Sequence, residues 1–287
     1  MPELPEVEVL ARQLAPLLRN QTIRAVEIRR AKVLPYALPA KFKSCLRGAR
    51  FMHLSRRGKY LLFTLQPPRA RRAFSLLGHL GMTGRMYLQP ASAPLSKHAV
   101  VVFSLGKDNF VFEDTRGFGS LRLGAGALET LGPEPLSDDF TVAFFARALK
   151  RSARAIKVKL LDQSLVAGMG NIYASEALFR AGISPRLSAR RLTLQQVEHL
   201  WRSVRATLAD AIQLGSSIPL DWSGAGRRDG LFYYGQAHGT PDVYQERLLV
   251  YDRADQPCSV CKVPIRRIVQ AARSTFYCPS CQGTQGR

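Results

Sequence analysis

The chain has 287 residues, of which 46% are hydrophobic and 22% charged, a composition that suits a folded protein and excludes a disordered one. Its length predicts two domains and leaves room for a small additional module. No apolar run approaches the roughly 18 residues of a membrane-spanning helix, and the acidic N-terminus does not resemble a signal peptide. We therefore expect a protein that stays inside the cell and does not act at membranes.

A large excess of positive charge points to an anionic partner. The chain has 42 Lys and Arg against 21 Asp and Glu, which gives a formal net charge of +21. The charges are also segregated, because residues 28–107, 140–161 and 256–287 contain no acidic residue. Three basic segments favour a phosphate backbone as partner. The alternative is a charged, solvated surface. A membrane surface is disfavoured because the basic residues do not lie on one amphipathic helix.

The first part of the chain is predicted to be one helix followed by strands. Residues 5–18 place apolar side chains at three- and four-residue steps, and Pro5 suits the first turn of a helix. Between residues 22 and 122, short apolar runs such as Tyr60–Leu65 and Val100–Leu105 alternate with Gly, Pro and basic clusters. This spacing predicts a β-sandwich or a barrel.

The second part is predicted to be helical and to follow a linker at residues 131–139, which is rich in Pro and acidic residues. Either Asp139 or Thr141 could cap the first helix. The segment Val166–Asn171 separates two later helices, and its glycines permit a sharp, close-packed turn. Helical periodicity covers residues 140–149, 153–161, 172–181 and 193–214.

Four of the five cysteines predict a metal site. Cys258-x2-Cys261 and Cys278-x2-Cys281 have the spacing of paired knuckles that place four thiolates around one zinc ion. Two disulfides are disfavoured in a reducing compartment, and four cysteines leave no open position for catalysis, so we expect one structural Zn²⁺. Cys45 lies outside the pattern and is expected to be idle or buried. Such a module alone does not define a function.

The N-terminus carries a candidate nucleophile. Removal of Met1 would expose Pro2 as a secondary amine, and an α-amino group has a pKa well below that of lysine. The helix that follows adds positive potential, while Glu3 and Glu6 place carboxylates beside the amine. An amine next to an acid is what imine chemistry at a sugar carbon requires. The alternative is an ordinary helix start whose acidic residues favour the helix dipole.

These residues belong to a set of motifs that resembles the formamidopyrimidine-DNA glycosylase family, bacterial repair enzymes for oxidised purines. The matching motifs run in order along nearly the whole chain: Met1–Glu8, Gly58–Leu61, His79–Gly84, Lys97–His98, Asp114–Gly119, Leu131–Phe140, Gly170–Glu176 and Arg273–Cys278.

The resemblance implies an α+β multi-domain fold with DNA in the cleft between domains. Residues 1–130 would form an N-terminal β-sandwich with an N-terminal helix, followed by the linker at 131–139. Residues 140–248 would form a helix–two-turn–helix domain with a lesion-recognition loop, and residues 249–283 a zinc-finger β-hairpin.

The resemblance also assigns catalytic roles. Pro2 would be the Schiff-base nucleophile, and Glu3 the proton donor in base release and sugar-ring opening. Lys59 matches the general acid/base lysine, and Glu6 is placed in the base pocket. Arg273 matches the arginine that binds the phosphates flanking the lesion and assists δ-elimination.

Further matched positions are expected to contact DNA: His98, Arg116, Lys157 and the phosphate-binding Asn171. Met82, Arg116 and Phe118 match the residues that fill the space left by an extruded base, and we call them the void-filling set. Phe118 would wedge between base pairs, while Arg116 would bond to the orphaned opposite base. Taken alone, Met82 and Phe118 would be assigned to the core, but their glycine-flanked turns favour the functional interpretation.

The chain departs from the family pattern in three places. Gly117 and Ser152 stand where a basic residue is common. Residues 214–244, where the lesion-recognition loop is expected, are longer and more aromatic than the pattern. The aromatic side chains there either stack on a flipped base or pack beneath the loop: Trp222, Phe232, Tyr233 and Tyr234. The preferred lesion and the preferred opposite base therefore stay open.

We interpret the sequence as that of a bifunctional DNA glycosylase/AP lyase that excises 8-oxoguanine and formamidopyrimidines and cleaves the strand by β,δ-elimination. Its partner would be damaged double-stranded DNA, bound by a monomer in the bacterial cytoplasm, at the nucleoid. One alternative is an endonuclease VIII-like preference for oxidised pyrimidines, which the void-filling set disfavours. The other is a catalytically silent, zinc-dependent DNA-binding protein, which the intact catalytic residues disfavour.

Overall fold

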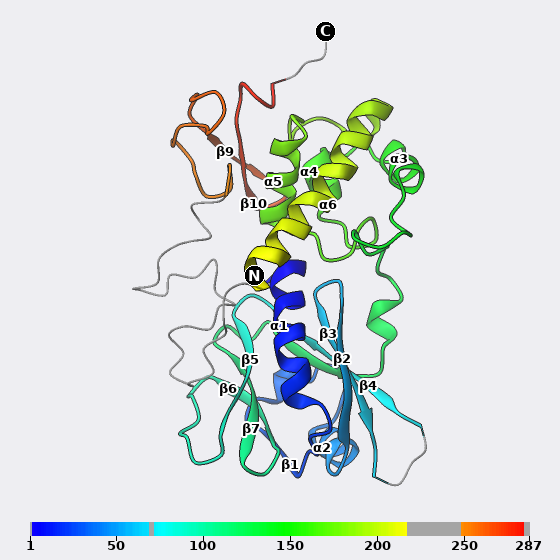
Figure 1. The fold of residues 1–287 in the computed structure, drawn as a ribbon, viewed down its shortest axis with the longest axis vertical. Coiled ribbons are helices and arrows are strands. Elements are labelled where there is room, and N and C mark those ends of the chain that lie inside the picture. Colours follow the sequence, from blue (N-terminus) through cyan, green and yellow to red (C-terminus); the bar gives the residue numbers. More distant parts are fainter. Residues whose placement is uncertain (1, 69–71, 217–247, 284–287) are drawn as a thin grey trace. The chain divides into compact units, whose positions relative to one another are not determined.

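The computed structural model describes residues 2–68, 72–216 and 248–283 (Figure 1). Its described residues form two compact units, one built mainly from Met1–Glu129 and the other from Thr130–Gln213 with residues 248–283. The helical segment and the cysteine module belong to one compact unit. The predicted boundary between them, at residues 248 and 249, therefore stays a prediction. Among the described residues, no helix is long and apolar enough to cross a membrane.

The first unit begins with helix α1 (Leu4–Leu18), close to the predicted range. Glu3 caps the helix in a capping box with Glu6, and the Glu3 backbone N–H donates to the Glu6 carboxylate at 2.7 Å. Pro5 stands in the first turn, where its missing N–H has no helical partner to lose. Apolar side chains of α1 are buried on the face that packs along strand β2 (Arg50–Arg57).

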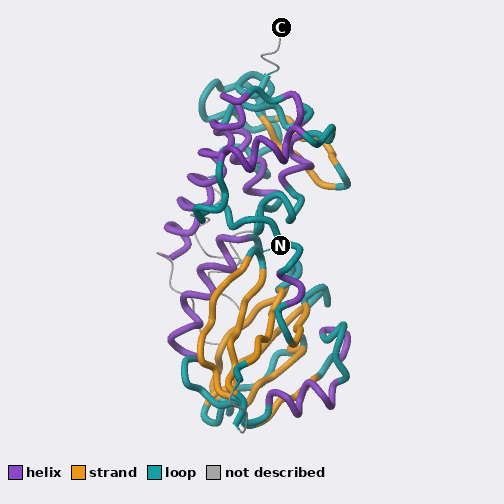
Figure 2. The backbone as a smooth tube through the Cα atoms, turned by 90° about the vertical axis from the view of Figure 1, so that its right-hand side faces the viewer, coloured by secondary structure: helices purple, strands orange, loops and turns teal. Residues whose placement is uncertain are grey.

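Two four-stranded antiparallel sheets follow α1, which confirms the predicted sandwich, and their strands appear together in Figure 2. One sheet has the order β1 (Ala25–Ile28), β6 (Ala99–Ser104), β7 (Asp108–Asp114) and β5 (Gly84–Pro90). The other has the order β2, β3 (Tyr60–Gln66), β4 (Phe74–His79) and β8 (Ser120–Leu123). A short helix, α2 (Pro39–Leu46), completes the unit.

An aromatic cluster joins the inner faces of the two sheets. Phe51 and Phe63 come from one sheet and Phe110 from the other, and the ring centroids of Phe63 and Phe110 lie 5.8 Å apart. Along β3 the buried residues alternate with less buried ones, as expected for a strand with one face in the core. The packed sheets provide a rigid base for the turns at their ends.

The described residues of the second unit include the helices α3 (Val142–Lys150), α4 (Ile156–Leu160), α5 (Asn171–Arg180) and α6 (Leu194–Ser216). Of the two candidate caps for α3, the structure uses Thr141, whose hydroxyl accepts from the Phe144 N–H at 3.1 Å. The guanidinium of Arg205 in α6 donates to the carbonyls of Pro135 and Ser137, both at 2.9 Å. The predicted linker is thereby attached to the helical unit.

The cysteine module carries a two-stranded hairpin of β9 (Arg266–Gln270) and β10 (Arg273–Tyr277). Gln270 pairs with Arg273, so Ala271 and Ala272 form a two-residue turn in which both have positive φ, 47° and 58°. Strand β10 packs against α5, beside which it is drawn in Figure 1. The module is therefore supported by the helical part of the unit.

Candidate active site and zinc module

The candidate nucleophile stands at the buried start of α1. Pro2, Glu3 and Glu6 are all buried, with Glu3 only 2% exposed. The capping box fixes both carboxylates next to the N-terminal residue. If Met1 is removed, an amine at Pro2 would have two carboxylates beside it that are largely shielded from water, the arrangement expected for imine chemistry.

Lys59 lies in the tight turn between β2 and β3, directly after Gly58, whose φ is +57°. The side chain of Lys59 is buried, and both flanking strands pack against α1. The guanidinium of Arg56 donates to the Glu8 carboxylate at 2.7 Å and to the Gly58 carbonyl at 3.1 Å. It thereby connects α1, which carries Glu3 and Glu6, to the turn that carries Lys59.

Sequence reasoning missed both partners of this bridge. Glu8 is part of the N-terminal motif and Arg56 precedes the motif of Lys59, but neither received a role. Only the packing of α1 on β2 brings them together, since 48 positions separate them in the chain.

His79, at the end of β4, is a further site residue without an assigned role. Its Nδ1 accepts from the Gly81 N–H at 3.1 Å, and its ring lies 4.9 Å from that of Tyr60. Burial lowers the pKa of His79 to about 4, and the positive charges of Lys59 and Arg122 act in the same direction. The ring is therefore neutral at pH 7, and because Nδ1 accepts, its proton is on Nε2.

The void-filling set lies on two turns of the first unit. Met82 is 40% exposed in the turn between β4 and β5, and Phe118 is 58% exposed in the turn between β7 and β8. Arg116 is exposed too, with its guanidinium carbon 5.2 Å from the centre of the Phe118 ring. These exposures exclude the alternative that Met82 and Phe118 are core residues.

His98 stands just before β6, near the same turns. Its carbonyl accepts from the backbone N–H of Asp114 at 3.0 Å, and its own N–H donates to the Ser96 hydroxyl at 3.1 Å. The Nδ1 atom of His98 is buried and has no hydrogen-bond partner among the residues that the structure describes. The DNA contact expected of His98 stays a prediction.

In the second unit, the predicted phosphate-binding residues are connected through a buried ammonium group. The Nζ of Lys157 donates to Asn171 Oδ1 at 2.6 Å, to the Ser274 carbonyl at 3.0 Å and to the Thr275 hydroxyl at 2.8 Å. The Asn171 amide nitrogen donates to the same Ser274 carbonyl at 2.9 Å. Arg273, the residue before Ser274, is exposed.

Lys157 is fully buried, which its positive charge did not suggest. An ammonium group has three N–H donors, and each has an acceptor here. A direct phosphate contact by Lys157 stays a prediction, and it would require the ammonium to leave one of these acceptors.

Glu176 is another residue that sequence reasoning left without a role. Its carboxylate is buried and accepts from three consecutive backbone N–H groups, those of Leu249, Val250 and Tyr251, at 2.8–3.0 Å. Burial raises the pKa of Glu176, and the three N–H groups oppose that effect. The carboxylate thereby anchors the segment that enters the cysteine module to helix α5.

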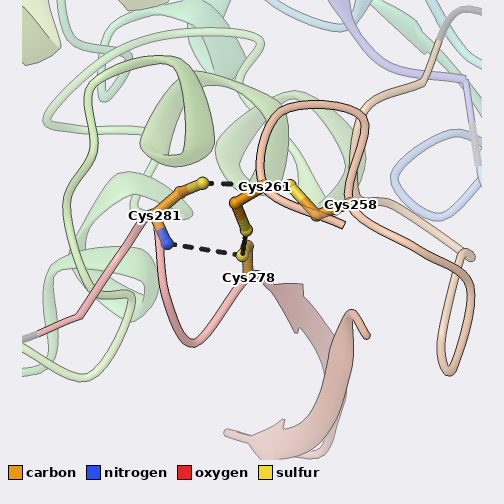
Figure 3. Close-up of side chains that lie close together, drawn as sticks. All are labelled: Cys258, Cys261, Cys278 and Cys281. Carbon is orange, nitrogen blue, oxygen red and sulfur yellow. Dashed lines mark hydrogen bonds between the residues drawn. The ribbon is translucent and has the colours of Figure 1, made fainter. Parts of the chain in front are cut away.

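The four predicted metal ligands are gathered in one place (Figure 3). Their sulfur atoms all lie within 4.8 Å of one another, with 3.8 Å between Cys258 and Cys281 and 3.4 Å between Cys261 and Cys278. Tetrahedral zinc with Zn–S of about 2.3 Å needs sulfurs about 3.8 Å apart, so the cluster fits the ion. All four are free thiols, and Cys45 lies apart on α2.

The expected lesion-recognition loop lies almost wholly outside the described residues, which end at 216 and resume at 248. Its aromatic residues lie there too: Trp222, Phe232, Tyr233 and Tyr234. Their stacking on a flipped base stays a prediction.

Comparison with protein families gives three matches that together cover most of the chain. Residues 1–121 match the formamidopyrimidine-DNA glycosylase N-terminal domain, and residues 131–220 match the formamidopyrimidine-DNA glycosylase H2TH domain. Residues 255–283 match a zinc finger found in FPG and IleRS.

Individual proteins are similar over their full length. The formamidopyrimidine-DNA glycosylase of Thermus thermophilus is 43% identical over 292 residues, covering 99% of both chains, and that of Desulfitobacterium hafniense is 40% identical, covering 98% of this chain and 100% of its own. The crystal structure of the MutM (Fpg) protein from Thermus thermophilus superposes with a TM-score of 0.81 at 40% identity, covering 98% and 99%.

A complex between Lactococcus lactis Fpg and DNA containing an abasic site superposes with a TM-score of 0.85 at 32% identity, covering 98% and 100%. The similarity thus includes a protein solved together with DNA.

Proposed function

The chain belongs to the formamidopyrimidine-DNA glycosylase family, and on this premise we propose that it excises oxidised purines from duplex DNA and then cleaves the strand by β,δ-elimination. The coarser part of this statement follows from family membership: the protein is a DNA-binding repair glycosylase with AP lyase activity and one zinc finger. The lesion, the covalent mechanism and the residue roles are the proposal.

The buried cluster of Pro2, Glu3 and Glu6 at the start of α1 supports the proposed covalent mechanism. The Pro2 nitrogen would attack C1′ of the damaged nucleoside while the bond from C1′ to the base breaks, and the base would leave with a proton from Glu3, which Glu3 regains from the Pro2 nitrogen. Glu3 would then protonate the ring oxygen, so that the sugar opens and an imine forms at C1′. The capping box holds Glu3 and Glu6 in place for these transfers.

Strand cleavage needs proton transfers at the opened sugar. Loss of a C2′ proton expels the 3′ phosphate, and a second elimination expels the 5′ phosphate. Lys59 would act as general acid/base in these steps, and the Arg56 bridge holds its turn against α1. Arg273 would bind the flanking phosphates and assist the second elimination.

DNA binding would involve both units, and the second would bind the phosphates. Asn171 stands at the N-terminus of α5, where helix N–H groups favour anions, and Arg273 is exposed on the neighbouring hairpin. Four thiolates would hold the Zn²⁺, which stabilises the module that presents Arg273. In the first unit, the void-filling set would occupy the space left by the extruded base. The proposed protein is a monomer, since the single catalytic cluster of one chain serves one duplex. Its proposed location is the nucleoid of a bacterial cytoplasm.

Borohydride trapping on a duplex with 8-oxoguanine opposite cytosine tests the proposal. Reduction of the imine should link the protein covalently to DNA, and Pro2→Gly should sharply reduce this link while binding to the duplex persists, because many phosphate contacts hold the DNA. Protein that retains an extra residue before Pro2 provides a second test, and its trapping should be sharply reduced too, because the Pro2 nitrogen is then an amide.

Two outcomes would contradict the proposal in different ways. Stronger trapping on a duplex with an oxidised pyrimidine would favour the endonuclease VIII-like alternative. Tight binding of 8-oxoguanine duplexes without any trapping or strand cleavage would favour a silent DNA-binding protein.

A further inference from the structure

A buried carboxylate lies beneath the turns that carry the void-filling set. Asp114 is the last residue of β7 and is 1% exposed. Its Oδ2 accepts from the Gly119 N–H at 2.7 Å, and its Oδ1 accepts from the Arg116 N–H at 3.2 Å. The carboxylate therefore fixes the segment between these residues at both ends, and Phe118 lies within it.

The same carboxylate holds the second turn. Oδ1 of Asp114 also accepts from the Thr83 hydroxyl at 2.7 Å, and the hydroxyl oxygen in turn accepts from the Arg116 N–H at 3.1 Å. Thr83 directly follows Met82. One buried acid thus connects the backbone of one turn to the Thr83 side chain of the other, and the two turns belong to different pairs of strands.

Close packing leaves the two turns little freedom. Gly81 has a φ of +65°, and a Cβ placed on it would lie 2.5 Å from the carbonyl carbon of Phe118. A Cβ on Gly119 would lie 2.5 Å from the Phe112 ring and 3.1 Å from Asp114 Oδ2. The backbone at Gly81 is therefore packed against the backbone at Phe118, and the backbone at Gly119 is packed against the buried Phe112 ring.

Asp114 also reaches the third segment with a predicted DNA contact. Its backbone N–H donates to the His98 carbonyl at 3.0 Å, and its carbonyl accepts from Arg30 at 3.5 Å. All these partners lie in the first unit, so the connections do not depend on the other unit.

We infer that Asp114 is the positioning residue of the void-filling set, holding Met82, Arg116 and Phe118 in one arrangement before DNA arrives. An exposed phenylalanine on a loose turn would lose conformational freedom on insertion, whereas one on a fixed turn has already lost it. The inference rests on the proposed function, because it assumes that the set enters DNA. Asp114 itself touches no base, and its effect passes through Arg116 and Phe118.

Asp114→Asn tests the inference with little change of volume. An amide has only one acceptor oxygen, so its NH₂ group must face either the Gly119 N–H or the Arg116 N–H. Thr83→Val and Thr83→Ser form a matched pair, since serine keeps the hydroxyl and valine keeps the shape. Arg116→Ala serves as the reference for complete loss of the base contact.

Three readouts separate positioning from chemistry and folding. Turnover on 8-oxoguanine opposite cytosine and opposite adenine gives a discrimination ratio. The fluorescence of 2-aminopurine next to the lesion reports unstacking by the inserted wedge. Trapping on a single-stranded oligonucleotide with an abasic site reports the Pro2 reaction alone, because no opposite base leaves a void there.

Arg116→Ala should lower the ratio by about 5- to 150-fold, the range for one base-edge contact. Asp114→Asn and Thr83→Val should lower it at least about 5-fold and reduce the 2-aminopurine signal, while Thr83→Ser and single-strand trapping stay near wild type. If Asp114→Asn does not fold, the comparison of Thr83→Val with Thr83→Ser tests the positioning role on its own.

Wild-type discrimination in Asp114→Asn and Thr83→Val, alongside its loss in Arg116→Ala, would overturn the positioning role. Absence of single-strand trapping by the wild-type protein would instead overturn the proposed function. An unchanged ratio in Arg116→Ala would overturn the role of the void-filling set, and the inference with it.

Discussion

The ammonium of Lys157 donates a hydrogen bond of 2.6 Å to the side-chain amide of Asn171, and both side chains also donate to the Ser274 carbonyl. The first turn of α5 and the hairpin that presents Arg273 are thereby held together through one buried group. Lys157 thus holds Asn171 and the Arg273 hairpin, the expected phosphate-binding elements, in place.

Lys157→Met should weaken DNA binding at every salt concentration while leaving the dependence of log K on log salt near that of the wild type. Methionine fills the space but cannot hold Asn171 or the hairpin, and a buried ammonium releases no counterion. Arg273→Ala is the control and should flatten the slope by about 0.9, the value for one phosphate. Binding isotherms between low and high salt measure both. An equal flattening in Lys157→Met would establish that its ammonium contacts a phosphate directly.

Glu8→Gln should slow single-turnover trapping more than it weakens DNA binding. The change replaces the charged acceptor of the buried Arg56 guanidinium with a neutral amide oxygen, so the turn of Lys59 is held less firmly against α1. Arg12→Ala is the matched control. Arg12 also bonds to Glu8 at 2.7 Å, but its side chain is 58% exposed, so its loss should have little effect. Equal rates in Glu8→Gln and the wild type would show that the bridge does not position Lys59.

His79 should make the protein less stable as the pH falls from about 6.5 to 4. Its pKa is lowered from 6.5 to about 4 in the folded protein, so between these values the unfolded chain binds the extra proton and gains stability relative to the fold. The full effect is about 3 kcal/mol in the free energy of unfolding.

Urea unfolding of the wild type and of His79→Asn at several pH values measures this effect. The difference between the two profiles isolates His79, because the raised pKa of Glu176 acts in the opposite direction and is common to both proteins. Parallel profiles over this pH range would show that His79 titrates normally.

Ala272→Gly should stabilise the hairpin that carries Arg273. Ala271 and Ala272 both have positive φ, which costs an L-residue about 1–2 kcal/mol and glycine almost nothing. Part of that gain is offset by the greater freedom of glycine in the unfolded chain, so we expect about 0.5–1 kcal/mol.

Zinc loss to a chelator, followed with a colorimetric indicator, should be slower in Ala272→Gly than in the wild type. Ala143→Gly on the exposed face of α3 is the control, and it should destabilise the protein by about 1 kcal/mol, because that residue is helical. Faster zinc loss in Ala272→Gly would show that the turn is not strained.

Local patterns in the sequence were sufficient for the elements and for the metal site. The apolar repeat of residues 5–18 predicted α1 to within one residue of its start, since such a repeat gives a helix one buried face. The two cysteine pairs predicted the ligand cluster, because short knuckles gather their own thiolates. Motif order along the chain identified the family.

Tertiary structure alone decided how the site residues are held. Glu8 and Arg56 are 48 positions apart, Thr83 and Asp114 31 positions, and Lys157 and Ser274 117 positions. No periodicity connects residues at such separations, because they meet only after strands pair and helices pack. The same packing removes water from Lys157 and His79, which changes what a basic residue does. A sequence shows a charge, whereas the fold decides whether that charge faces DNA, another side chain or the interior.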